Sequence, residues 1–221
     1  MELYAAMRTA FAARQFTDEP VPDDVLGQIF ENARFAPSGG NRQGEHVIVI
    51  RDRATKEAIG QLAIPAAKRY SAQIRAGENP WNTVIPTTVD EATIDATAAP
   101  PALVETYGGA PVVLIVCVDL AVVASVDSGL ERIGIVSGAS IYPFVWNILL
   151  AARNEGYGGA LTTMPIKEEP SLKALLGIPD QVAVAAVIPL GRPVKQFTRL
   201  RRKGVAEFVR HERWEGKPFS I

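Results

Sequence analysis

Apolar positions near the N-terminus recur at intervals of three and four residues, which is the spacing of one face of an α-helix. This spacing predicts a first amphipathic helix over residues 3–14, ending near Arg14. A second helix is predicted over residues 21–37, with Pro22 in its first turn and Pro37 as its stop. The same reasoning predicts further helices over residues 53–64, 138–156 and 169–180, the last closed by Gly177.

Three runs rich in β-branched and aliphatic residues predict buried strands, over residues 46–50, 111–118 and 181–190. Helices and strands are interleaved along the chain, with no internal repeat and no linker that would separate two halves. A single domain over residues 1–221 is therefore expected. Residues 77–101 follow neither period, so they are expected to form a lid or binding loop, or else a variable surface insertion.

The predicted helix over residues 138–156 is apolar on more than one face. Ile141, Val145 and Ile148 lie on one side, while Trp146 and Leu150 make the opposite side apolar as well. A helix that is apolar all round is buried, and in a chain of this size a second subunit can complete the burial. This pattern indicates a homodimer; the alternative is a central helix of a monomer.

The charge balance excludes several partners. With 23 basic and 24 acidic residues, the formal net charge is −1, so no global field attracts nucleic acid or an anionic membrane. Asp119 interrupts the longest apolar region, residues 110–126, which therefore predicts a buried strand and a loop and not a membrane span. The N-terminus has no uninterrupted apolar region of the secretory kind. The single cysteine, Cys117, fits a reducing compartment and a core position, so a cytoplasmic protein is expected.

Several kinds of catalytic chemistry lack their sequence signals. His46 and His211 are the two histidines, and neither has the spacing or the neighbours of a metal site. The sequence contains no GxSxG nucleophile motif, no GxxxxGK[ST] phosphate loop and no GxGxxG after a strand. If the protein is an enzyme, a bound organic cofactor is therefore expected to carry the chemistry.

Parts of such a cofactor site are present along the chain. Arg14 and the run RLRRK, residues 199–203, offer guanidinium groups that can bind a phosphate through paired hydrogen bonds. The bend APSGGNRQ, residues 36–43, and the stretch EGYGGALTT, residues 155–163, offer backbone and side-chain donors to a flat ligand. Each segment has a simpler alternative. The run RLRRK can be a solvated charge run or a weak nucleic-acid patch, and the bend APSGGNRQ can be a helix cap with a turn. The stretch EGYGGALTT can be a glycine-rich turn into a strand.

In this order, the segments resemble the nitroreductase family of flavin enzymes. The residues that carry the resemblance are ARQFTDEPVPDDVLGQIFENARFAPSGGNRQ, GASIYPFVWNILLAARNEGYGGALTT, LLGIPD and GRPVKQFTRLRRKGV. The resemblance implies an α+β fold with a central, mainly antiparallel sheet flanked by helices, and a homodimer with an extended C-terminal segment. It also implies FMN bound at the subunit interface, with NADH or NADPH as electron donor.

The resemblance also implies roles for particular residues. Arg14 corresponds to an N-terminal phosphate ligand, and Arg201 or Arg202 to a C-terminal one. The bend that packs on the flavin ring, contributed across the dimer, is implied for Pro37, Ser38, Gly39, Asn41 and Gln43. The backbone along the ring edge is implied for Gly159, Ala160, Leu161 and Thr162. Ser140 is expected to be a further cofactor-binding residue. The segment around Trp81 and Tyr107 is expected to shape access to the flavin.

Two departures from the family pattern affect these expectations. The family usually has an R-S-x-R pattern that ends at the position of Arg14, whereas residues 10–13 here are Ala-Phe-Ala-Ala. One phosphate contact is therefore expected to be missing or to come from Arg8. Gln43 is followed by Gly44 and Glu45 where the family commonly has proline and tryptophan, so the local packing must differ.

The leading hypothesis is an FMN-dependent oxidoreductase that passes hydride from NAD(P)H to an electron-poor small molecule such as a nitroaromatic or a quinone. A specialised flavin protein of the same fold, which fragments flavin or reductively removes a halogen, is one alternative. Asn41 and Gln43 favour the ordinary reductase over it. The second alternative is a non-catalytic protein that sequesters FMN.

Overall fold

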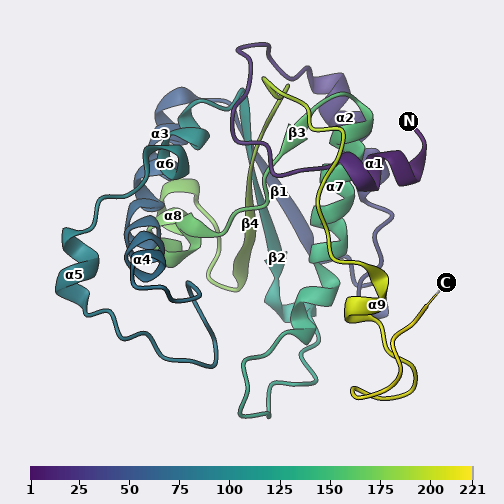
Figure 1. The fold of residues 1–221 in the computed structure, drawn as a ribbon. Helices are drawn as coiled ribbons and strands as arrows, with labels where there is room; N and C mark the ends of the chain where they lie inside the picture. The colour runs from purple at the N-terminus through teal and green to yellow at the C-terminus, as the bar shows by residue number, and fades with distance from the viewer. Residues whose placement is uncertain (221) are drawn as a thin grey trace.

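A four-stranded sheet forms the centre of the molecule in the computed structural model, which describes residues 1–220. Its strands are β1 (Glu45–Ile50), β2 (Val112–Asp119), β3 (Gly158–Gly159) and β4 (Val182–Gly191), in the order β1-β2-β4-β3. All three neighbouring pairs are antiparallel. Helices flank the sheet on both sides (Figure 1), so the predicted α+β architecture with an antiparallel sheet is confirmed.

Strand β2 faces a core on each side, which explains why its sequence is apolar at every position before the final Asp119. Val112, Leu114 and Val116 point into a cluster with α2 (Asp23–Ala33) and α7 (Tyr142–Asn154). Val113, Ile115 and Cys117 point into a second cluster with the helices on the opposite face. Because successive side chains of a strand alternate between faces, a strand between two helical layers must be apolar throughout.

The helices that contribute buried side chains to this second cluster are α3 (Arg53–Leu62), α6 (Pro101–Gly108) and α8 (Glu169–Leu176). Gly177 follows α8 in the left-handed conformation, with φ 66°, as expected of a glycine that ends a helix. The remaining elements are α1 (Leu3–Thr9), η1 (Gly39–Asn41), α4 (Ile64–Arg75), α5 (Glu91–Ala96), η2 (Leu120–Val122), η3 (Val136–Ser140), η4 (Met164–Glu168) and α9 (Val205–Phe208).

Several predicted helix boundaries were wrong. The first helix ends at Thr9 and not near Arg14, because the following residues are extended and bridge to other segments: Ala12 to Gly159, and Phe16 to Pro193. The second helix ends at Ala33, before Pro37. The long helix begins at Tyr142, and residues 136–140 before it form a 3₁₀ turn.

Residues 77–101 are more ordered than their sequence suggested. They contain α5, which Asp90 caps by accepting from the Thr93 N–H at 2.7 Å. The Glu78 carboxylate accepts from the Thr87 hydroxyl at 2.6 Å and from the Thr88 N–H at 2.7 Å. These hydrogen bonds lower the pKa of Glu78 to about 2. Hydrogen bonds to polar side chains, and not a periodic apolar pattern, therefore order this segment.

Tyr107 was expected to shape access to the site but lies in the core. Its side chain is 1% exposed, and its hydroxyl lies 3.3 Å from the Thr162 hydroxyl. Burial raises the pKa of Tyr107 to about 12. Its role in the described structure is therefore to join α6 to the segment after β3.

Candidate cofactor-binding site

The extended segment after α1 brings Arg14 beside the glycine-rich stretch that follows α7. The Ala13 N–H donates to the Gly159 carbonyl at 3.1 Å, and Ala12 forms a parallel bridge with Gly159. On its other side, the Arg14 carbonyl accepts from the Thr106 hydroxyl at 3.1 Å. Segments that are far apart in sequence therefore fix the backbone of Arg14.

Two neighbouring cavities border this segment. The first, which we call the glycine cavity, has a volume of about 220 Å³ and lies between β3, α7 and the C-terminal segment that descends along α7 (Figure 1). Its polar lining residues are Arg153, Gln196 and Arg202. The second, the Arg14 cavity, has a volume of about 780 Å³ and is lined by Arg14 and Lys195, among others.

Phe11 and Ala12 line both cavities. Phe11 packs edge-to-face against Phe197 of the C-terminal segment, with ring centroids 4.8 Å apart. Phe11 belongs to the run Ala-Phe-Ala-Ala, residues 10–13, that precedes Arg14. The two cavities are therefore neighbours with a common apolar wall.

Positive charge collects around this wall. Arg14 and Lys195 line one cavity and Arg153 and Arg202 the other, and within residues 1–220 none of these four side chains forms an ion pair with a carboxylate. Glu105 is the one acidic residue among the lining residues of the two cavities. Guanidinium groups with free N–H donors bind phosphate through charge-assisted, often paired hydrogen bonds. The cavities therefore suit a ligand that carries a phosphate.

The stretch from Gly159 to Thr162 alternates between the sheet and the glycine cavity. The Ala160 N–H donates to the Pro189 carbonyl at 3.4 Å, and the Thr162 N–H donates to the Val187 carbonyl at 3.0 Å. Gly159 and Leu161 line the cavity. Within residues 1–220, the Leu161 N–H has no hydrogen-bond acceptor. Of the four predicted ring-edge residues, Gly159 and Leu161 are thus placed to meet a ligand.

Glycine is required at position 159 by the close approach of β4. A Cβ atom there would lie 2.8 Å from the Pro189 carbonyl oxygen and 3.0 Å from Cγ2 of Ile188. Backbone this close to a neighbouring strand leaves no room for any side chain. The glycine therefore lets the cavity wall consist of backbone, which a flat ligand can approach closely.

The predicted bend is held by two serine hydroxyls. The Gly39 N–H donates to the Ser140 hydroxyl at 3.1 Å, and the Gln43 N–H donates to the Ser38 hydroxyl at 3.0 Å. Asn41 and Gln43 adopt left-handed backbone conformations, with φ of 53° and 49°. Non-glycine residues in this region carry strain, which clusters at binding sites. Ser140, by its contact with Gly39, positions the bend.

Within one chain, the bend is separate from both cavities. None of residues 37–43 lines the glycine cavity or the Arg14 cavity, and Pro37, Gly39, Asn41 and Gln43 are exposed. The single chain therefore brings together Arg14, Gly159, Leu161 and Arg202, but not the residues of the bend.

Arg201 and Arg202 differ in position. Arg202 lines the glycine cavity, whereas Arg201 is exposed and lines neither cavity. Arg8, considered as a substitute for the missing phosphate contact, also lines neither; its guanidinium lies 6.0 Å from the centre of the Tyr4 ring on α1.

The sequence reasoning missed Arg153, Lys195 and Gln196. Arg153 lies in the last turn of α7, where a cation is common because it stabilises the helix. Lys195 and Gln196 lie in a segment without periodicity. No local signal distinguished these residues from ordinary surface groups.

The departure after Gln43 also has a structural reason. A Cβ atom on Gly44 would lie 2.5 Å from Cγ2 of Val122, and the Gly44 carbonyl accepts from the Asp119 N–H at 2.8 Å. Glu45 then begins β1 opposite Val118. Close packing on η2 therefore favours glycine at this position over a larger residue.

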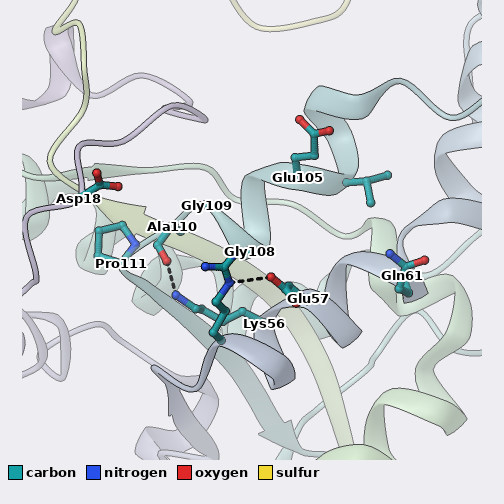
Figure 2. A pocket seen from close by; sticks show the side chains of 11 residues that line it. Asp18, Lys56, Glu57, Gln61, Glu105, Gly108, Gly109, Ala110 and Pro111 are labelled. Atoms are coloured by element: carbon teal, nitrogen blue, oxygen red, sulfur yellow. Dashed lines mark hydrogen bonds and ion pairs between the residues drawn. The ribbon is translucent and has the colours of Figure 1, made fainter.

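A third cavity, of about 600 Å³, lies between α3 and the end of α6 (Figure 2). Its cations are already engaged: Lys56 donates to the Ala110 carbonyl at 2.6 Å, and Arg53 pairs with Glu57 at 2.8 Å. Burial lowers the pKa of Lys56. Asp18 and Glu105 add negative charge to its lining. This cavity is therefore a poorer site for a phosphate than the two described above.

Other classes of site find no support in the part of the chain that the structure describes. No group of three or more histidine, cysteine, aspartate or glutamate side chains is arranged to hold a metal ion among residues 1–220. Cys117 is 2% exposed, and burial raises its pKa to about 11, which disfavours the reactive thiolate. Across the same residues, none of the helices combines the length and apolar character needed to span a membrane.

The fold and the cationic cavities define an α+β protein suited to a flat, phosphate-bearing ligand. The family model for the nitroreductase family matches residues 7–192, and the chain belongs to this family.

Relatives in the family have more than one described activity. One, in Methanothermobacter thermautotrophicus, is provisionally described as an NADH dehydrogenase/NAD(P)H nitroreductase; it is 26% identical over 206 residues, 88% of this chain and 79% of the relative. An iodotyrosine deiodinase of Nematostella vectensis is 25% identical over 210 residues, 94% of this chain and 74% of the relative.

A solved iodotyrosine deiodinase with FMN and 3-iodo-L-tyrosine bound has the same fold. Its TM-score is 0.68 at 21% identity, over 96% of this chain and 100% of the other.

Proposed function

We propose that this protein is an FMN-dependent oxidoreductase that takes hydride from NADH or NADPH and passes it to an electron-poor acceptor such as a nitroaromatic or a quinone. The observation that carries the proposal is the group of unpaired cations around two cavities beside the Gly159 backbone, in a chain of the nitroreductase family. FMN, when bound, would accept and donate the hydride.

The chain's own residues would bind and orient the cofactor. Arg14 and Arg202 would hold the phosphate, and the Leu161 N–H would donate to the edge of the ring, where negative charge develops on reduction. Ala160 and Thr162 would support this edge from the sheet side. No side-chain acid or base is needed for hydride transfer, in keeping with the absence of a histidine from the two cavities.

The proposal includes a homodimer in which the bend of one protomer, with Pro37, Ser38, Gly39, Asn41 and Gln43, completes the site of the other. Its support is the exposed apolar surface next to the glycine cavity. Tyr142 and Trp146 on α7 are 44% and 43% exposed, and Trp146 also lines the glycine cavity. An apolar helix face left open in one chain is the kind of surface that a second subunit covers.

The loop before α7 adds to this surface. Ile133 and Ile135 are 61% and 69% exposed. Hydrogen bonds nevertheless hold the loop in place, because the Asp127 carboxylate accepts from the Ile135 N–H and from the Arg132 guanidinium, each at 2.8 Å. These hydrogen bonds, that from Ile135 above all, lower the pKa of Asp127 to about 2. An anchored loop that displays apolar residues is expected to meet a partner surface.

The dimer can be tested by sedimentation equilibrium without added flavin. The wild type is expected at twice the chain mass of 23.8 kDa. Trp146→Glu should raise the dimer dissociation constant by more than about tenfold, because a buried carboxylate without a partner is costly. The control is Val84→Glu, at an 84% exposed position that lines neither cavity. A wild type at the mass of one chain would contradict the dimer.

The redox function is tested by the visible spectrum of the purified protein, with FMN added if needed, followed by anaerobic addition of NADPH and then NADH. A bound flavin that bleaches with either nucleotide is expected. Reoxidation by a nitroaromatic or a quinone would then demonstrate turnover. Failure of the protein to bind FMN would overturn the proposal.

Reductive dehalogenation is the alternative that the deiodinase relative favours, since that protein matches 94% of the chain. Release of iodide from 3-iodotyrosine by the reduced protein would support it over the reductase. A flavin that binds but stays oxidised with both nucleotides would instead support sequestration, or flavin fragmentation if the bound flavin is consumed in the presence of oxygen.

The role of residues 77–101 and the cellular location stay predictions. Within one chain, Pro101 lines the Arg14 cavity and no other residue of 77–101 lines either cavity, so a lid over the partner's site remains a proposal for this segment. A cytoplasmic location rests on the sequence alone.

A further inference from the structure

The segment before Arg14 provides no side-chain donor for a phosphate. Residues 10–13 are Ala-Phe-Ala-Ala, and Phe11 is packed against Phe197. Any additional cation at the glycine cavity must therefore come from another element. The cavity has such a residue on α7, which supplies Arg153 to its lining.

Arg153 is held so that much of its guanidinium is free. Its Nε–H donates to the Thr9 hydroxyl at 3.0 Å, and that hydroxyl donates in turn to the Ala5 carbonyl at 2.6 Å. Within residues 1–220, the two terminal nitrogens of Arg153 make no hydrogen bond, and the side chain forms no ion pair. A guanidinium anchored through Nε keeps its terminal N–H donors for a ligand.

Thr9 also fixes the C-terminal segment at the same cavity. The Gln196 side-chain amide donates to the Thr9 carbonyl at 3.1 Å and to the Phe197 carbonyl at 2.7 Å. Arg202, six residues further along this segment, lines the cavity with Arg153. Thr9 therefore ties together the elements that carry both cations.

We propose that Arg153, positioned by Thr9, is a phosphate-binding residue of this chain and makes it select FMN over riboflavin. The inference rests on the proposed function, because it assumes that the glycine cavity takes a flavin. It assigns to α7 a contact that the segment before Arg14 lacks. Together with Arg202, Arg153 supplies two guanidinium groups to one cavity.

The test is to measure dissociation constants for FMN and for riboflavin by quenching of flavin fluorescence. Arg153→Met keeps an unbranched, shorter side chain but removes the charge and the N–H donors. It should weaken FMN binding by about 10- to 150-fold, the range for loss of a charged hydrogen bond, and leave riboflavin binding unchanged. Arg153→Lys should restore part of the preference for FMN. Arg75→Met is the matched control, since Arg75 is exposed on α4 and lines neither cavity.

Thr9→Val gives a second measurement, because it keeps the charge of Arg153 but removes the acceptor for Nε. A smaller loss of FMN affinity is expected, again without a change for riboflavin. A purely structural role of Arg153 would weaken both flavins equally, and that result would overturn the inference. Equal affinity of the wild type for FMN and for riboflavin would also overturn the inference, while leaving the proposed function intact. If neither flavin binds, both proposals fail.

Discussion

Ile148→Ala is expected to lower the free energy of unfolding by about 2–5 kcal/mol, the range for truncating a fully buried aliphatic side chain to alanine. Ile148 is 0% exposed on α7, in the cluster that joins this helix to α2 and the sheet. The loss combines the apolar surface returned to water with the cavity left behind. Urea denaturation followed by circular dichroism would measure it, at fixed protein concentration because a dimer's stability depends on concentration.

Leu175→Ala is the control for this measurement. Leu175 is 43% exposed on α8, so its truncation should change the free energy of unfolding by less than about 0.5 kcal/mol. A loss of under 1 kcal/mol for Ile148→Ala would mean that α7 does not pack on the sheet as described. The position of the glycine cavity would then lose its support.

Arg14→Ala is expected to weaken FMN binding by about 1.5–3 kcal/mol, or about 10- to 150-fold, as for a lost charged hydrogen bond. Within residues 1–220, the Arg14 guanidinium has one hydrogen-bond acceptor, the Ala12 carbonyl at 3.5 Å, which is a weak contact. Its backbone is fixed by Thr106, so the side chain starts from a defined position. Fluorescence titration with FMN would measure the change.

Arg201→Ala is the control, since Arg201 is exposed and lines neither cavity. It should leave the FMN dissociation constant within about twofold of the wild type, because an exposed charge outside the cavity lining is screened by water and salt. Arg202→Ala should resemble Arg14→Ala, and the pair decides which C-terminal arginine binds the phosphate. An unchanged dissociation constant for Arg14→Ala would remove Arg14 from the site.

Local chemistry predicted much of the fold. The run over residues 111–118 is apolar at every position, and that pattern requires a strand covered on both faces. Gly177 marked the end of α8 because a left-handed residue there favours glycine. The long helix was recognised from its apolar residues, although its first turn was placed too early. Such features depend on residues close together in the chain.

The first helix shows where this reasoning fails. Ala10 and Phe11 continue the helical spacing, but their neighbours form bridges to β3 and to the C-terminal segment. Backbone hydrogen bonds to distant segments outweighed a weak local preference for helix. Arg14 lies on the wall of its cavity because the chain before it is extended and not helical.

The sequence by itself determined the kinds of groups available: arginines for a phosphate, a glycine-rich stretch for close approach, a polar bend, and apolar faces for two cores. The tertiary structure alone decided which of them meet. It placed Gly159 beside Ala12, turned Arg202 and not Arg201 to the cavity, and recruited Arg153 from the end of α7. The physical reason is that residue type and spacing set local conformation, whereas a binding site depends on contacts between segments whose pairing only the packed sheet and helices define.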